Sequence, residues 1–311
     1  MARYRNDLPQ TAGRLFLTDA GLETVLVFLE GMELPQFAAF PLLETEEGRA
    51  ALTRYYEPFL ELARAKGAGF VLGTPTWRAN PDWGALLGYD LERLRAVNIA
   101  SVDFIAGLRD AWETPATPVV LDGVIGPRGD GYKAGRMEAG EAEDYHAFQI
   151  AAFAQGGADM VSAVTMNTVN EAVGVARAAQ ALRMPCAISF TVETDGRLVD
   201  GVSLREAIEA TDEATGGAPA YYMINCAHPT HFEPALAAGE AWVERIRGVR
   251  ANASTKSHAE LDESETLDIG DIADLGRRYG ALTRRFPRMR VLGGCCGTDH
   301  RHVAAICEAC A

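Results

Sequence analysis

The chain has 311 residues, of which 48% are hydrophobic and 23% charged, as expected for a globular protein with a large core. Its formal net charge of −14 disfavours nucleic acid as a partner, because an acidic surface repels phosphate groups. No stretch approaches the roughly 20 apolar residues that cross a bilayer, and residues 1–10 lack the apolar core of a secretory signal. We therefore expect a cytoplasmic protein whose six cysteines are reduced and available for metal binding or catalysis.

Apolar runs typical of strands alternate with Ala/Leu/Glu/Arg-rich helical stretches along the chain. The expected strands are residues 15–18, 69–73, 119–124, 160–164, 187–191, 221–225, 249–252 and 291–293. The main helical patterns are residues 48–66, 91–111, 141–156, 170–182, 203–214 and 269–286. Strands that alternate with helices predict a parallel sheet, and eight of them suit one (β/α)8 TIM barrel domain spanning residues 1–311.

An open, doubly wound sheet is the alternative architecture. The first strand runs into Asp19 without the GxGxxG loop that a dinucleotide would need. Polar residues follow most of the expected strands: Asp19, Thr74, Thr76, Thr165, Thr191, Asn225 and Asn252. In a barrel these strand ends converge on one face, where active sites form.

Three cysteines stand at two of these strand ends. Cys226 follows the sixth strand, and Cys295 and Cys296 follow the eighth. Three thiolates suit Zn²⁺, which accepts tetrahedral sulfur ligation, and three protein ligands leave a fourth position open for a substrate. The alternative is that Cys226 is a small buried hydrophobe and the adjacent pair has no role in a glycine-rich turn. Packing is the expected role of Cys186, Cys307 and Cys310, although the last two have CxxC spacing.

Residues 225–229 (NCAHP) and 293–297 (GGCCG) resemble the zinc signature of the homocysteine S-methyltransferases. Residues 17–21, 124–127, 188–191 and 249–252 are similar to further segments of that family, in the same order. The resemblance implies a (β/α)8 barrel that binds Zn²⁺ through Cys226, Cys295 and Cys296. It also implies transfer of a methyl group from a sulfonium or betaine-type donor to the thiolate of homocysteine, giving methionine.

The resemblance extends to groups that support catalysis. It implies that Asp19 lies near the substrate amine, although Asp at a helix start is also a common N-cap. Asn225 and Asn252 are expected to support catalysis by holding the rim around the metal. Thr74, Thr76 and Thr165 are expected to contact the substrate.

Two positions bear on substrate recognition. Val164 stands where the family commonly has a Glu that helps to hold the homocysteine ammonium. Glu23 can supply that charge, or it can be a solvated residue in the first helix. Trp77 can face a cationic donor, because an indole face attracts a sulfonium or ammonium, or it can pack at the rim. His228 is expected at the rim and not as a fourth ligand.

Three alternative functions would use the same predicted site residues. The acceptor can be another small thiol or selenol, for example a mercapto acid without an amine, or the methyl group can come from a separate corrinoid protein. A non-enzymatic alternative is a zinc or redox sensor that releases its metal when Cys295 and Cys296 are oxidised. Residues 129–140 read as a loop over the rim and are hypothesised to be a lid. The expected partners are small molecules, and a homo-oligomer is compatible with the sequence.

Overall fold

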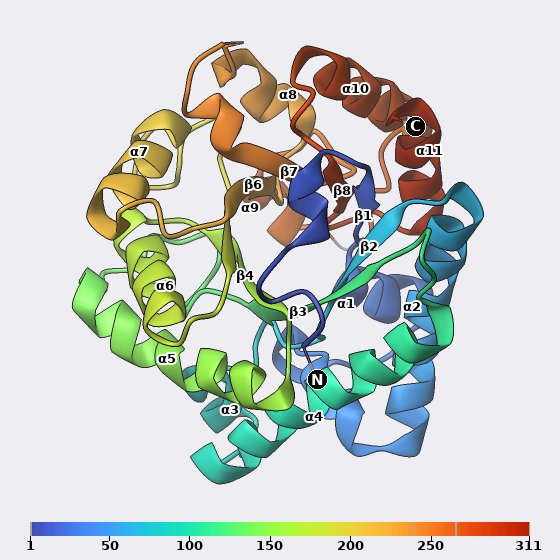
Figure 1. The fold of residues 1–311 in the computed structure, drawn as a ribbon, viewed down its shortest axis with the longest axis vertical. Coiled ribbons are helices and arrows are strands. Elements are labelled where there is room, and N and C mark those ends of the chain that lie inside the picture. Colours follow the sequence, from blue (N-terminus) through green and yellow to red (C-terminus); the bar gives the residue numbers. More distant parts are fainter. Residues whose placement is uncertain (1, 238, 265, 311) are drawn as a thin grey trace.

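A computed structural model describes residues 2–237, 239–264 and 266–310. Eight parallel strands pair in sequence order, and β8 pairs with β1 to close the sheet into a barrel (Figure 1). The strands are β1 (Phe16–Leu17), β2 (Gly69–Gly73), β3 (Val119–Ile125), β4 (Met160–Met166), β5 (Cys186–Phe190), β6 (Tyr221–Asn225), β7 (Ile246–Ala251) and β8 (Val291–Gly294). The predicted (β/α)8 barrel is confirmed.

Helices form the outer layer around the strands. They are α1 (Leu22–Thr24), α2 (Glu46–Lys66), α3 (Pro81–Leu86), α4 (Leu91–Trp112), α5 (Ala139–Gly156), α6 (Val169–Ala181), α7 (Leu204–Thr215), α8 (Pro229–Phe232), α9 (His258–Asp262), α10 (Ile272–Arg285) and α11 (His300–Cys310). The six predicted helical patterns correspond to α2, α4, α5, α6, α7 and α10. A capping box of Ser203 and Glu206 fixes the start of α7, because each side chain accepts a hydrogen bond from the other residue's backbone.

The observed strand boundaries differ most from the predicted ones in β4 and β7. β4 continues two residues beyond the expected end, and β7 begins at Ile246, three residues before the expected start. The start of β7 could not be predicted from the sequence, because neither Arg247 nor Gly248 is typical of a buried strand. Cys186, expected to precede a strand, is the first residue of β5 and is buried.

The N-terminal segment covers the end of the barrel where the strands begin, and it crosses the barrel centre in Figure 1. Leu8 packs into a cluster with side chains from the strands. The Gln10 amide donates to the Tyr221 hydroxyl at 3.4 Å. This end is therefore filled by side chains, and the space for a ligand lies at the other end.

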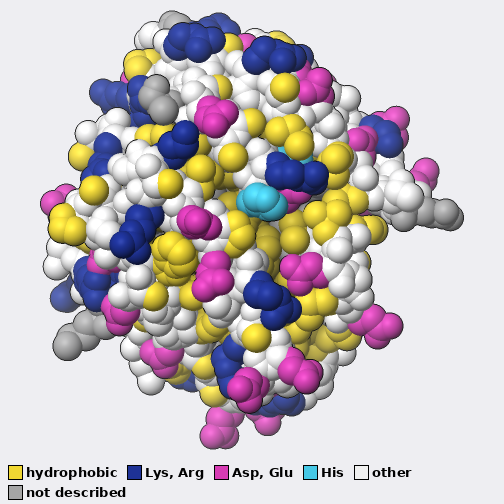
Figure 2. All heavy atoms as spheres, turned by 90° about the vertical axis from the view of Figure 1, so that its right-hand side faces the viewer, with side chains coloured by type: hydrophobic (Ala, Val, Ile, Leu, Met, Phe, Trp, Pro, Cys, Tyr) yellow, Lys and Arg dark blue, Asp and Glu magenta, His cyan; other side chains and the backbone are white. Residues whose placement is uncertain are grey.

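Between the strands and the helices lies a continuous hydrophobic core. Among the described residues, none of the helices combines the length and the apolar character that crossing a membrane requires. On the face drawn in Figure 2, acidic and basic side chains are interspersed. The acidic excess of the chain is therefore not gathered into one patch on that face.

Candidate functional site

A cavity of about 410 Å³ opens at the carboxyl ends of the strands. Its wall includes every site residue that the sequence predicted: Asp19, Glu23, Thr74, Thr76, Trp77, Thr165, Asn225, Cys226, Asn252, Cys295 and Cys296. The expected convergence of the strand ends on one face is confirmed, because these residues come from segments as far apart as residues 19 and 296.

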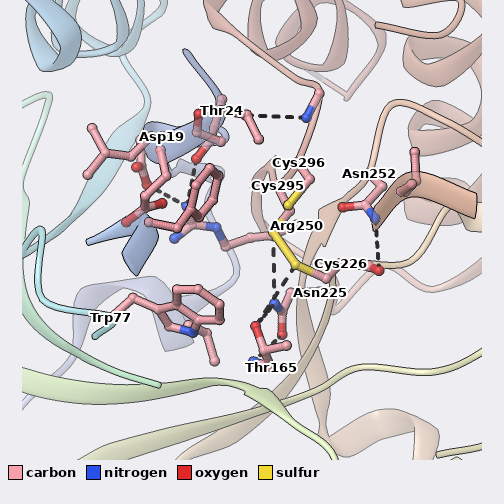
Figure 3. A pocket seen from close by; sticks show the side chains of 18 of the residues that line it. Asp19, Thr24, Trp77, Thr165, Asn225, Cys226, Arg250, Asn252, Cys295 and Cys296 are labelled. Atoms are coloured by element: carbon pink, nitrogen blue, oxygen red, sulfur yellow. Dashed lines mark hydrogen bonds and ion pairs between the residues drawn. A yellow bond between two sulfur atoms is a disulfide. The ribbon is translucent and has the colours of Figure 1, made fainter. Parts of the chain in front are cut away.

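The three cysteines meet at one side of this cavity. Their Sγ atoms all lie within 4.8 Å of one another, close enough to be ligands of one ion. Cys226 and Cys295 are joined as a disulfide, while Cys296 is free (Figure 3). The ligand role of all three therefore requires reduction of this pair.

The oxidised pair differs from the one expected. The sensor alternative paired the adjacent Cys295 and Cys296, whereas the structure pairs Cys295 with Cys226. The Cα atoms of Cys226 and Cys295 are 5.5 Å apart, inside the usual disulfide range of about 4.4–6.8 Å. Neighbouring residues have Cα atoms only about 3.8 Å apart, which disfavours a bond between them.

Asn225 connects the cysteines to two neighbouring strands. Its Oδ1 accepts hydrogen bonds from the Thr165 backbone N–H at 2.8 Å and from the Ser189 hydroxyl at 2.7 Å. Its amide nitrogen donates to the Thr165 hydroxyl at 2.9 Å and lies 3.9 Å from the Cys295 sulfur. The side chain thereby fixes the end of β4 against β6 and directs a donor at one of the sulfurs.

The backbone at Cys226 is held by two further side chains. The Asn252 amide donates to the Cys226 carbonyl at 2.9 Å, and His258 Nε2 lies 2.6 Å from the same oxygen. Cys226 has a φ of 53° and Thr165 a φ of 63°, a region that costs a residue with a side chain free energy. These hydrogen bonds hold that strained conformation where the sulfur enters the site.

Asp19 is the carboxylate partner of Arg250. The two side chains form an ion pair at 2.7 Å (Figure 3). The Tyr55 hydroxyl donates to the other Asp19 oxygen at 3.1 Å. Asp19 is buried and does not cap a helix, since the N-cap of α1 is Gly21. The N-cap interpretation of Asp19 is therefore wrong, and its charge is already paired within the protein.

Comparison with known proteins assigns the chain to a family. Residues 16–310 match the homocysteine S-methyltransferase family. The chain belongs to the homocysteine S-methyltransferase family. The family match makes this protein a methyltransferase that acts on small molecules, as the resemblance of residues 225–229 and 293–297 implied.

Solved structures of the homocysteine methyltransferase MmuM from Escherichia coli have the same fold as this methyltransferase. The oxidised form is 20% identical, with a TM-score of 0.73, over 98% of this chain and 99% of that chain. The metallated form is also 20% identical, with a TM-score of 0.69, over 95% and 96% of the two chains. No match was found among curated proteins.

Glu23 lies on the cavity wall and is partly buried, so the structure does not place it among fully solvated side chains. Burial, together with the nearby charge of Asp19, raises the pKa of its carboxyl to about 7 against the attraction of Arg78. Val164 also lines the cavity. This methyltransferase therefore carries an unpaired acidic group on α1 and an apolar side chain at the end of β4.

Trp77 lies on the cavity wall, but a cation already covers its ring. The Arg78 guanidinium is 4.7 Å from the centroid of the Trp77 ring and 3.7 Å from that of Trp83. Thr74 and Thr76 are buried, and their hydroxyls are 2.6 Å apart. The Thr76 hydroxyl donates to the Val124 carbonyl and the Thr74 hydroxyl accepts from the Val124 N–H, so both hydroxyls join β2 to β3.

The predicted loop over the rim brings Tyr132 into the site. Its hydroxyl lies 3.9 Å from the Cys296 sulfur, and its ring lies 4.2 Å from that of His258. The Asn167 amide holds the loop by donating to backbone carbonyls of Asp130, Gly131 and Lys133. The loop therefore contributes a wall of the cavity in this structure, and its movement as a lid stays a prediction.

His228 is not one of the clustered metal-ligating groups. It is the N-cap of α8, where its side chain accepts from the Thr230 N–H. Burial lowers the pKa of its imidazole to about 4, so the ring is neutral at physiological pH. His228 is buried and does not line the cavity, so its expected place at the rim stays a prediction.

Four residues of the site were not predicted: Arg78, Tyr132, Arg250 and His258. Arg250 carried a signal, since a charged residue inside an otherwise apolar strand must find a partner within the barrel. Arg78 directly follows Trp77 but has no pattern of its own. His258 reaches Cys226 across 32 residues of chain, and only the folded structure shows that contact.

Proposed function

We propose that the barrel domain, residues 1–311, is a zinc-dependent S-methyltransferase that moves a methyl group from a sulfonium or betaine-type donor to homocysteine, giving methionine. The observation that carries this proposal is the group of three cysteine sulfurs within 4.8 Å of one another on the cavity wall. Membership of the homocysteine S-methyltransferase family supports the choice of acceptor.

The side chains at the site fit a zinc ion. Reduced Cys226, Cys295 and Cys296 would hold it, and three sulfur ligands leave one tetrahedral position for a substrate. When bound, zinc would lower the pKa of the acceptor thiol so that the nucleophilic thiolate is present at neutral pH. Because the ligands must be thiols, we place the protein in the reducing environment of the cytoplasm.

The reaction consists of a single displacement at the methyl carbon. The acceptor thiolate attacks that carbon in line, a new S–C bond forms, and the bond from carbon to the donor sulfonium or ammonium breaks. The bonding electrons stay on the donor atom, so the donor leaves with a neutral thioether sulfur or amine nitrogen. Since no proton moves at the methyl group, alignment of the two substrates and exclusion of water are the main tasks of the cavity.

We assign positioning roles to the polar groups that hold the sulfurs. Asn225 joins the end of β4 to β6 and donates toward Cys295. Asn252 fixes the Cys226 carbonyl. Asp19 holds Arg250, whose Nε donates to the Gly294 carbonyl at 3.2 Å just before the cysteine pair. Each acts through a neighbouring group, and the acceptor would occupy the position that the three sulfurs leave open.

The test measures zinc content and methyl transfer from S-methylmethionine to homocysteine in reduced protein. We expect about one zinc per chain and turnover in the wild type, and loss of both in Cys296→Ala, because two ligands hold the ion far less tightly. Cys307→Ala is the matched control: Cys307 is a buried cysteine of α11 that does not line the cavity. It should retain both zinc and turnover.

Two outcomes would contradict the proposal. Zinc content that is unchanged in Cys296→Ala would exclude the three-cysteine site. Zinc bound to the wild type without turnover would exclude S-methylmethionine and homocysteine as the donor and acceptor pair. The same assay with other thiols, or with a methylated corrinoid protein as donor, would then identify which of the two differs.

A further inference from the structure

The Arg78 guanidinium is a buried charge with unused hydrogen-bond donors. It lies on the cavity wall between two indole rings, Trp77 and Trp83. Its Nε and Nη1 atoms are buried and have no hydrogen-bond partner among the described residues. The indole faces attract the cation, but they leave the N–H groups at its edge unsatisfied. Such donors carry a free-energy cost that a ligand with an acceptor can remove.

Glu23 presents the opposite charge on the same cavity. Its carboxyl is enclosed, and it forms no ion pair within 4.0 Å of any basic group in the part of the chain that the structure describes. Arg78 and Glu23 nevertheless attract each other, since each stabilises the charged form of the other. The cavity therefore holds one acidic group and one guanidinium that are near each other but form no ion pair.

The other charges on the wall are already used or open to solvent. Asp19 and Arg250 form their ion pair at 2.7 Å. Asp268 accepts from the Ser254 hydroxyl at 2.8 Å and lies 3.5 Å from the Lys256 ammonium. Asp262 is exposed at the rim. Glu23 and Arg78 are therefore the enclosed charges that a bound molecule can pair with.

We propose that Glu23 and Arg78 together bind the α-ammonium and α-carboxylate of an amino-acid substrate, the ammonium at Glu23 and the carboxylate at Arg78. A guanidinium presents a planar fork of donors that matches a carboxylate, and a carboxylate accepts readily from an ammonium. The assignment rests on the proposed methyl transfer. It assigns to Glu23 and Arg78 the selection of an amino acid over a thiol or sulfonium that carries only an ammonium or only a carboxylate.

Two substrates of the proposed reaction carry this pair of charges. A thiol amino acid would place it on the acceptor, and a sulfonium amino acid would place it on the donor. Both present the same ammonium and carboxylate to the protein. The experiment therefore uses analogues of each substrate that lack one of the two groups.

The first measurement is calorimetric binding and needs neither zinc nor turnover. L-Methionine, 3-(methylthio)propylamine and 4-(methylthio)butanoate differ only in the α-carboxylate and the α-amine. We expect wild type to bind methionine about 10- to 100-fold more tightly than either analogue, because each deletion leaves one charge unpaired. Arg78→Met should bind methionine no more tightly than 3-(methylthio)propylamine, which lacks the carboxylate. Glu23→Gln should bind methionine no more tightly than 4-(methylthio)butanoate, which lacks the amine.

The second measurement compares kcat/KM in reduced, zinc-loaded enzyme. Homocysteine is compared with 3-mercaptopropylamine as acceptor, and S-methylmethionine with dimethyl(3-aminopropyl)sulfonium as donor. Arg78→Met should lower kcat/KM for the carboxylate-bearing partner by about 10- to 100-fold, mainly through KM, and leave its analogue unaffected. Whether the selectivity is lost on the acceptor or on the donor identifies which substrate Arg78 binds.

Arg93→Met is the matched control. Arg93 also stacks on an aromatic ring, 4.1 Å from the centroid of Tyr89, but it lies on α4 outside the cavity. Arg93→Met should leave the ratios of affinity and of kcat/KM between each substrate and its analogue unchanged. Arg78→Lys should keep part of the preference for the compound with the carboxylate that Arg78→Met loses. The proposal is overturned if Arg78→Met lowers binding of methionine and its amine analogue equally, or if wild type does not distinguish them. Selective methionine binding without methyl transfer would instead contradict the proposed function alone.

Discussion

The two ends of the barrel differ in whether a charged side chain there has hydrogen-bond partners within the protein. At the end where the strands begin, Asp159 is buried, and its oxygens accept from the Arg3 and Tyr4 backbone N–H groups, the Leu121 N–H and the Arg109 side chain. At the end where the strands finish, the Arg78 Nε and Nη1 atoms have no hydrogen-bond partner within the described residues, and Glu23 forms no ion pair there.

This difference indicates that charged groups at one end of the barrel contribute to folding stability, and that those at the other end contribute to ligand binding. A buried carboxylate with four hydrogen bonds stabilises the fold, whereas a buried charge without them lowers stability until a ligand binds. The same chain thus satisfies the Asp159 carboxylate where the N-terminal segment closes the barrel and leaves two donors of Arg78 unsatisfied at the cavity. The comparison predicts that substitutions at the closed end change unfolding and that substitutions at the open end change binding.

The largest expected effect is at the closed end. Asp159→Ala removes one partner of Arg109, from an ion pair in which Asp159 is 0% and Arg109 2% exposed. Removal of one member of a buried pair costs about 3–5 kcal/mol, because the remaining charge stays in a medium of low polarity. Denaturant unfolding should show this loss in the free energy of unfolding, with KM for both substrates unchanged in the folded fraction.

Glu209→Ala is the control for loss of a surface charge. Its partner Arg205 is 54% exposed and Glu209 is 51% exposed, so the pair contributes less than about 1 kcal/mol. An equal loss in Asp159→Ala and Glu209→Ala would remove the contrast between the closed end and an ordinary surface. A raised KM in Asp159→Ala would show that the closed end is coupled to the cavity.

Asp122 lies between the two ends, and it gives the second prediction. It is buried inside the barrel near Ser162 and Arg250, and burial raises the pKa of its carboxyl to about 7, well above the usual value for an aspartate. The unfolded chain loses this proton near pH 4 and the folded chain near pH 7. The stability that the protonated group contributes is complete below pH 4 and is lost as pH rises through 7.

Asp122→Asn keeps the uncharged shape at every pH. The free energy of unfolding of the variant relative to wild type should therefore rise by about 2 kcal/mol between pH 5 and pH 8. Urea unfolding at both pH values measures this difference. A difference that is constant with pH would mean that Asp122 is ionised throughout, with Arg250 as an effective counter-ion.

The sequence predicted the fold because the barrel repeats a local pattern. Short apolar strands and capped amphipathic helices are visible one segment at a time, and their order implied the closed sheet. The three cysteines could be predicted because they stand at strand ends in a recognisable motif. Their proximity then follows from the barrel, which brings the ends of β6 and β8 to the same rim.

The charge pairs of the site could not be predicted in this way. The pairing of Arg250 with Asp19 depends on which strands are neighbours after closure, since β7 reaches β1 only across β8. The position of Arg78 between Trp77 and Trp83 depends on side-chain packing after β2. Asp19 was therefore expected to be free for a substrate, and the structure shows it bound within the protein.

The smallest expected effect compares two tyrosines, one at each end. The Tyr132 hydroxyl lies 3.9 Å from the Cys296 sulfur at the open end, and the Tyr4 hydroxyl donates to Glu113 at 2.7 Å at the closed end. Tyr132→Phe should weaken zinc binding by about three- to tenfold. This loss is at the low end of what is found when a group that contacts a metal ligand is removed, because the contact between Tyr132 and Cys296 is long. Tyr4→Phe should leave zinc affinity unchanged and lower the free energy of unfolding by about 1 kcal/mol. Competition with a chelator and urea unfolding of both variants measure the two effects, and equal zinc affinity in both would mean that the loop carrying Tyr132 does not support the metal site.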